Sequence, residues 1–227
     1  MGKGKVLKSC LVIADIAGQF DALTRLVAKV PKSTIKLSLG DMCDRGPRSK
    51  EVFEYFMDGY GKDKFALMGN HEHLMVNTLL GSSYRCYSWQ DWPCNGGNAT
   101  LDSYPNKEVP KEVLTWINAL PLTMEFEGAE GMPKMLASHA PLYHPIKDLP
   151  VEPSTDQICE ITWNRYPPIY REGYFQIFGH NSHWGLRQFL EDGQTNPFAL
   201  CIDQSRKQIL TGYLFPEGEI LEVPYTD

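Results

Sequence analysis

The stretch "VIADIAGQFDAL", Val12–Leu23, indicates the fold class of the chain. Its apolar residues end at Asp15, a glycine follows at Gly18, and the next residues have the spacing of an amphipathic helix. A buried strand that ends in a carboxylate and turns through glycine into a helix is typical of α/β proteins, which bind ligands at the carboxyl ends of strands. Ala17 stands where a catalytic loop would usually carry a second polar group.

Strand and helix patterns alternate through the N-terminal half. The apolar spacing predicts strands at Val6–Ile13, Thr34–Leu39 and Lys64–Met68, and helices at Phe20–Val30, Ser49–Met57 and Glu72–Leu80. Alternation of this kind predicts parallel βαβ units.

The second half has a different pattern. Residues 81–110 lose periodicity and gain Gly, Asn, Ser, Pro, Trp and Tyr, which predicts a loop-rich insert with room for one short helix. After it we expect a helix at Pro110–Asn118 and a strand pair in "LPLTMEFEG" and "PKMLASHA". The turn-separated strands expected in the last third, mostly antiparallel, are Tyr174–Phe178, Gly185–Leu190, Phe198–Ile202, Gln208–Leu214 and Glu219–Val223.

The composition fits one globular domain over residues 1–227. With 42% hydrophobic residues the chain can bury a large core. Its net charge of −6 argues against general nucleic-acid or membrane binding, because such partners need a basic surface. The 6 cysteines show no CxxC pair, so we expect free, mostly buried thiols in a reducing cytoplasm. No segment is long enough to span a membrane.

Polar side chains follow five of the predicted strands. They are Asp15, "GDMCDRGP" (Gly40–Pro47), "GNHEH" (Gly69–His73), "SHAP" (Ser138–Pro141) and "FGHNSH" (Phe178–His183). Aspartate, asparagine and histidine that meet at one sheet edge form an oxygen and nitrogen site for a divalent metal.

The ordered motifs "GDMCDRG", "GNHE", "SHA" and "FGH" resemble the calcineurin-like metallophosphoesterase superfamily, and within it the phage lambda and bacterial branch of the phosphoprotein phosphatases. "NGG" (Asn95–Gly97), "LPL" (Leu120–Leu122) and "WNR" (Trp163–Arg165) fall in the same order, so the resemblance covers nearly the whole chain. It implies an α/β fold, a four-layer α/β/β/α sandwich of two packed mixed sheets, with a binuclear metal centre at one edge.

The resemblance also implies roles for individual residues. The first metal would be held by Asp15 and Asp41, and the second by Asp41, Asn70, His139 and His180. A metal-activated hydroxide would attack phosphorus, and the catalytic group would be His71, Asp44, Arg45 and Arg165, with His71 as acid, Asp44 as its orienting group and the arginines on the phosphate. Manganese is the expected metal, with iron, zinc, nickel and magnesium as alternatives.

The first metal site departs from the family pattern. The family motif is usually G-D-x-H-G, whereas this chain reads Ala14-Asp15-Ile16-Ala17-Gly18. Ala17 replaces a histidine ligand, so we expect this site to be weak or empty.

Simpler structural roles compete for some of these residues. The aspartates could be turn residues, Asn70 could cap the helix after it, and the two strand-end histidines could be ordinary core residues. We expect Cys43 to pack inward, His183 to contact substrate, and His73 and His144 to have surface or supporting roles. The aromatics Tyr84, Tyr87, Trp89 and Trp92 fit either a cap over the site or a small satellite core.

The leading functional prediction is a metal-dependent phosphomonoesterase, a serine/threonine or tyrosine protein phosphatase that also accepts small phosphoesters. The alternatives are a hydrolase of dinucleoside polyphosphates or other nucleotides, and a pseudophosphatase that binds phosphorylated ligands without turnover. "GNHE" favours the phosphatase over the dinucleoside branch, whose motif typically ends in aspartate. The resemblance implies a phage or bacterial source and a cytoplasmic location.

Overall fold

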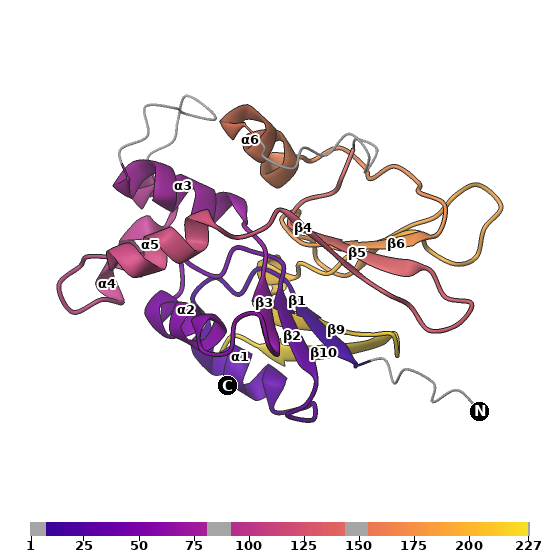
Figure 1. Ribbon diagram of the computed structural model, residues 1–227, viewed down its shortest axis with the longest axis horizontal. Coiled ribbons are helices and arrows are strands. Elements are labelled where there is room, and N and C mark those ends of the chain that lie inside the picture. The colour runs from indigo at the N-terminus through magenta and orange to yellow at the C-terminus, as the bar shows by residue number, and fades with distance from the viewer. Residues whose placement is uncertain (1–7, 81–91, 144–153, 227) are drawn as a thin grey trace.

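The computed structural model describes residues 8–80, 92–143 and 154–226 (Figure 1). Two 5-stranded sheets form its centre. In spatial order the first contains β10 (Glu219–Pro224), β9 (Ile209–Phe215), β1 (Cys10–Ile13), β2 (Ile35–Ser38) and β3 (Lys64–Ala66). The second contains β4 (Thr123–Phe126), β5 (Lys134–Ser138), β6 (Tyr174–Phe178), β8 (Ala199–Cys201) and β7 (Arg187–Phe189).

Alternate residues of β1 enter two different cores. Leu11 and Ile13 pack under the helices, whereas Cys10 and Val12 pack between the sheets against residues such as Ile177. Successive side chains of a strand point to opposite faces, so a strand that is apolar throughout must be covered on both sides. The two packed mixed sheets with helices outside confirm the predicted sandwich.

The helices lie on the outer faces of the sheets. The bounds are α1 (Phe20–Val27), α2 (Ser49–Met57), α3 (Asn70–Leu79), α4 (Gly97–Asp102), α5 (Lys111–Asn118) and α6 (Thr155–Trp163), with short 3₁₀ turns at Pro93–Asn95 and Ser205–Lys207. In Figure 1, α1 and α2 lie against the first sheet and α6 above the second. No helix among the described residues is long and apolar enough to cross a membrane.

The predicted strand directions were partly wrong. The N-terminal strands β1, β2 and β3 are parallel, as expected. However, β5, β6 and β8 are also parallel, and only β4 and β7 pair antiparallel within the second sheet. The last two strands form a hairpin that joins the first sheet beside β1. Apolar spacing reports which face of a strand is buried, but not the direction of its neighbour.

Helix α6 was not predicted, although its start carries a recognisable signal. Ser154 accepts a hydrogen bond from the Gln157 amide, and the Gln157 side chain accepts one from the Ser154 amide. This capping box satisfies amides that would otherwise lack partners at the helix start. The helix lies in the crossover between parallel strands β5 and β6, where a connection of this kind is required.

Two further predictions need correction. Asn70 is the first residue of α3 and not its cap, because the N-cap position is occupied by Gly69. Cys10, Cys43 and Cys201 are free and buried, Cys94 is exposed, and Cys159 is disulfide-bonded. The expectation of free thiols throughout was therefore wrong.

Candidate functional site

The loops after β1, β2, β3, β5 and β6 meet at one edge of the sandwich. Their backbones are unusual, since positive φ angles occur at Asp15, Ala17, Asp41, Asp44, Arg45 and His180. A non-glycine residue in this region costs about 1–3 kcal/mol and persists only where its surroundings hold it. Hydrogen bonds between loops do so here: the Ala17 amide donates to the Asp41 carbonyl (2.8 Å), and the Gly46 amide donates to the Ala17 carbonyl (2.9 Å).

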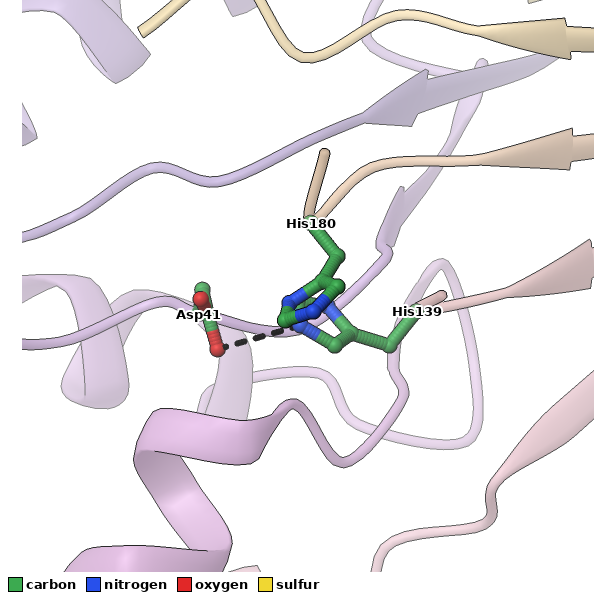
Figure 2. A group of neighbouring side chains, drawn as sticks. All are labelled: Asp41, His139 and His180. Carbon is green, nitrogen blue, oxygen red and sulfur yellow. Dashed lines mark ion pairs between the residues drawn. The ribbon is translucent and has the colours of Figure 1, made fainter. Parts of the chain in front are cut away.

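The four residues predicted for the second metal converge. The ligand atoms of Asp41, His139 and His180 all lie within 4.8 Å of one another, and Figure 2 shows the three side chains pointing toward a common centre. The Asn70 Oδ1 atom lies 2.9 Å from both His139 Nε2 and His180 Nδ1. We call these four residues the histidine cluster.

The protonation of the histidine cluster suits a cation. His139 Nδ1 donates to the Leu39 carbonyl (2.9 Å), so its Nε2 presents a lone pair, which faces Asp41 Oδ1 at 3.4 Å. Burial lowers the pKa of His139, and burial followed by the proximity of His139 lowers the pKa of His180 to about 3. Among the described residues, His180 Nε2 is buried without a hydrogen-bond partner. The lone pair of His139 Nε2, the Asp41 carboxylate, the Asn70 oxygen and a neutral His180 ring together fit a divalent metal ion.

Asp41 and Asp15 have opposite electrostatic surroundings. Burial opposes ionisation of Asp41, but the nearby imidazoles of His139, His71 and His180 outweigh it, and its pKa falls to about 2. Burial raises the pKa of Asp15, and the carboxylates of Asp203 and Asp41 raise it further. The Asp15 carboxylate accepts a hydrogen bond from the His180 amide at 3.0 Å.

Asp203 was missed by the sequence analysis. It follows β8 as His180 follows β6, and these neighbouring parallel strands end at the same edge. Its side chain is buried and accepts a hydrogen bond from the Ser205 amide at 2.8 Å. The signal was the same as for the other junctions, an apolar strand that ends in a carboxylate, but no quoted family motif included it.

Ala17 adds only a buried methyl group to this region. Both of its backbone groups are used in the loop contacts described above, so Ala17 supplies no ligand. We call Asp15, Ala17 and Asp203 the Asp15 cluster.

His71 lies between a carboxylate and a guanidinium. Its Nδ1 is 2.6 Å from Asp44 Oδ2, and its Nε2 is 2.8 Å from Arg45 Nη2. Because a guanidinium can only donate, His71 Nε2 accepts and the ring proton is on Nδ1. Burial opposes protonation of the ring, but Asp41 and Asp44 outweigh it and raise the pKa of His71.

Asp44 is itself held by residues that the sequence analysis did not assign. Trp92 Nε1 lies 3.1 and 3.0 Å from the two Asp44 oxygens, and Thr100 Oγ1 donates to Asp44 Oδ1 at 2.6 Å. Gly97 lies against the Trp92 ring, where an added Cβ would come within 2.5 Å. Trp92 is therefore a buried support of the His71–Asp44 pair. Tyr84, Tyr87, Trp89 and His144 lie outside the described residues.

Glu72, the last letter of "GNHE", serves the backbone. Its carboxylate accepts hydrogen bonds from the amides of Asp41 (2.7 Å), Met42 (2.7 Å) and Gly69 (2.9 Å). Burial and the charge of Asp41 raise its pKa to about 7. Since both oxygens are occupied by these amides, Glu72 fixes the loops after β2 and β3 and gives no information about the substrate.

The remaining predicted residues have varied environments. Arg165 is exposed just after α6, and its charge helps to lower the pKa of His180. His183 is half-buried, and its amide donates to the Asp203 carbonyl at 3.1 Å. His73 is buried beside Cys159 (3.8 Å), so of the two roles expected for it the surface role is excluded and the supporting role stays a prediction. Burial raises the pKa of the Cys43 thiol, which fits the inward packing expected for it.

The fold and the site together define a class of protein. The profile of the calcineurin-like phosphoesterases matches residues 9–204, so the chain belongs to this family.

Proteins of known name share part of this sequence. The chain is 32% identical over 120 residues to a symmetrical bis(5'-nucleosyl)-tetraphosphatase of Vibrio campbellii, covering 51% of this chain and 40% of that protein. A protein of the same name from Nitrosococcus oceani is 31% identical over 113 residues, covering 48% and 37%. The alignments thus span about two fifths of these relatives.

Solved structures support the fold. The crystal structure of a putative diadenosine tetraphosphatase has a TM-score of 0.68 at 21% identity, covering 97% of this chain and 95% of that one. A cold-active protein-tyrosine phosphatase of a Shewanella species gives 0.57 at 18% identity, covering 96% and 78%. At these identities the likeness shows the fold alone.

Proposed function

We propose that the protein hydrolyses phosphoanhydride bonds in dinucleoside polyphosphates. The observation that carries this proposal is the sequence similarity to symmetrical bis(5'-nucleosyl)-tetraphosphatases. Glu72, the residue by which the sequence favoured a protein phosphatase, binds backbone amides, so its preference for that branch rests on resemblance and not on a contact with substrate. The proposal therefore ranks the dinucleoside polyphosphate hydrolase above the protein phosphatase, whereas the sequence alone favoured the protein phosphatase.

In this proposal the histidine cluster holds one divalent metal, for which manganese is our expected ion. Asp15, together with Asp41, holds the other metal, called the first metal in the sequence analysis, more weakly, because Ala17 provides no imidazole. Metals bound there would supply positive charge for the phosphate oxygens and would lower the pKa of a water molecule.

The protein's own groups perform the remaining steps. Arg45 has to leave His71 Nε2 before that nitrogen can carry a proton, and an incoming phosphate offers the guanidinium a stronger partner. Asp44, fixed by Trp92 and Thr100, then stabilises the protonated ring. His71 donates its Nε2 proton to the departing oxygen, and Arg165 contacts the phosphate chain.

A substrate comparison tests this function. The chain loaded with manganese should cleave a symmetrical dinucleoside tetraphosphate into two nucleoside diphosphates, and chelator should abolish the reaction. Preferential hydrolysis of a phosphoserine peptide, with no cleavage of the tetraphosphate, would contradict the proposal.

A phosphomonoesterase is the second candidate, and the buried His71–Asp44 pair favours it. General-acid help matters most when the leaving oxygen is strongly basic, as in a serine phosphoester, and less when the leaving group is a phosphate. Replacing His71 by alanine should cut phosphoserine hydrolysis by about 100-fold or more. If anhydride hydrolysis falls much less in the same variant, the acid is dispensable for the proposed reaction; equal losses would indicate that His71 also serves phosphate binding.

A further inference from the structure

Two tyrosines form an exposed pair on the surface beside the metal centre. The side chains of Tyr143 and Tyr166 are 53% and 71% exposed. Their ring centroids are 5.8 Å apart and the ring planes are inclined by 46°. Large exposed aromatic surfaces are unfavourable in water, so such a pair points to a ligand.

The pair is fixed to the segments that carry the predicted site residues. The Asn164 side-chain amide donates to the Pro141 carbonyl (2.6 Å), and the Tyr166 amide donates to Asn164 Oδ1 (3.0 Å). These bonds join the segment after α6 to the segment after β5, which begins with His139.

Trp163, at the end of α6, brings the same segment to the histidine cluster. Its ring meets the His180 ring edge-on, with centroids 6.1 Å apart. Arg165 lies between Trp163 and Tyr166 in the chain, and its side chain is exposed. The same segment thus carries an exposed cation, whose charge acts on His180, and one of the two exposed aromatic rings.

We propose that Tyr143 and Tyr166 form a stacking site for a nucleobase of the substrate, with Arg165 on the polyphosphate between this base and the metal centre. This inference rests on the proposed function. Every nucleobase has a π face that stacks on aromatic side chains without a need for specific hydrogen bonds. A guanidinium beside the rings suits the phosphates that connect the base to the scissile bond.

The test compares substrates with and without a base. Steady-state kinetics of Tyr166→Ala and Tyr143→Ala should show KM for diadenosine tetraphosphate raised about tenfold, within the range known for loss of one stacking ring. Hydrolysis of inorganic tripolyphosphate and p-nitrophenyl phosphate should be unchanged, and Tyr166→Phe should retain the wild-type KM.

Tyr170→Ala provides the matched control. Tyr170 is 50% exposed and packs edge-on against Phe198, with ring centroids 5.7 Å apart. Its replacement removes an exposed tyrosine without touching the pair, so KM for the tetraphosphate should not change.

Equal losses on the substrates with and without a base would overturn the inference, since they would mean that the tyrosines only support the loop. No change on any substrate would overturn it too. If the wild-type chain does not cleave the tetraphosphate, the proposed function fails. Inhibition of p-nitrophenyl phosphate hydrolysis then tests separately whether the two tyrosines bind a nucleobase. ADP should then inhibit more strongly than pyrophosphate, and Tyr166→Ala should abolish the difference; equal inhibition in the wild type would refute the base site.

Discussion

The histidine cluster contains Asp41 and the Asp15 cluster is electrostatically coupled to it, but the two clusters differ in the chemistry that they offer a cation. The first combines Asp41 with two neutral imidazoles and an amide oxygen, all buried. The second has two buried carboxylates, of which Asp203 raises the pKa of Asp15, and, at Ala17, a methyl group where the family usually has histidine. A difference of one imidazole should therefore separate a tight site from a weak one.

The largest effect is expected from a change in the histidine cluster. His180→Ala removes the imidazole whose Nε2 is buried without a partner, so metal affinity there should collapse. Hydrolysis should fall by about 100-fold or more, because loss of even a supporting group costs 10- to 100-fold. Elemental analysis after dialysis against manganese should give about one equivalent for the wild type and none for the variant. If the variant retained one equivalent of manganese, the histidine cluster would not be the tight metal site.

Restoring the missing histidine should have the next largest effect. Position 17 has φ of 49°, a conformation in which histidine is several-fold enriched, so its backbone conformation suits histidine. Ala17→His should lower the manganese concentration for half-maximal rate by about tenfold and raise the maximal rate. A manganese titration of activity with a metal count measures both. Ala17→Ser is the control, because a hydroxyl is a poor substitute for imidazole.

An unchanged titration for Ala17→His would mean that the Asp15 cluster is not limited by the missing ligand. If two metals were then bound without turnover, the lesion would lie in the His71–Asp44–Arg45 group, and ligand binding without turnover would become the better hypothesis.

Asp203→Asn should change stability and metal demand in opposite directions. Removing this charge relieves repulsion of Asp15, so the pKa of Asp15 should fall and the metal-free protein should gain thermal stability. The same loss of charge should raise the manganese requirement several-fold if Asp203 faces the cation. Thermal unfolding with and without manganese separates these effects. A variant that is less stable in both conditions would indicate that Asp203 only holds the Ser205 turn.

The smallest effect is the pH dependence of the metal-free protein. His73 and His180 have pKa values lowered to about 4 and about 3, so these two rings bind fewer protons in the folded than in the unfolded state, and their contribution to stability rises up to about pH 6.5. Glu72 has a pKa raised to about 7, and those of Asp15 and His71 are also raised. The two carboxyl groups hold extra protons in the folded state from about pH 4 upward and so offset the rise from the histidines. Above about pH 6.5 the lowered histidines contribute no further rise, so the raised groups dominate and stability should fall.

The melting temperature should accordingly change little between about pH 4.5 and pH 6.5 and drop by a few degrees toward pH 8, at about 2–4 °C for each kcal/mol. Manganese should stabilise the protein more at pH 8 than at pH 6.5, because a bound cation replaces the protons on the carboxylates. A flat profile in the absence of metal would indicate that the carboxylates are already neutralised by another cation.

The sequence by itself determined the parts of the protein that depend on neighbouring residues. Helix α2 (Ser49–Met57) and strand β6 (Tyr174–Phe178) have the predicted limits, because their apolar spacing is local and the period is clear. The motifs around Asp41, Asn70 and His139 predicted a metal site because strand ends bring polar groups to one edge, and the resemblance to a known family supplied the two-sheet sandwich.

Only the tertiary structure decided which hydrogen-bond partners the site residues have and which strands lie beside one another. The Asp41 amide donates to the Glu72 carboxylate across 31 residues of sequence, and Trp92 donates to Asp44 across 48 residues. The His180 amide donates to the Asp15 carboxylate across 165 residues. The placement of β9 and β10 beside β1 is equally non-local. Periodicity records that a side chain is buried, whereas the choice of neighbour, and with it the proton on His71 and the charge around Asp15, depends on how the two sheets pack.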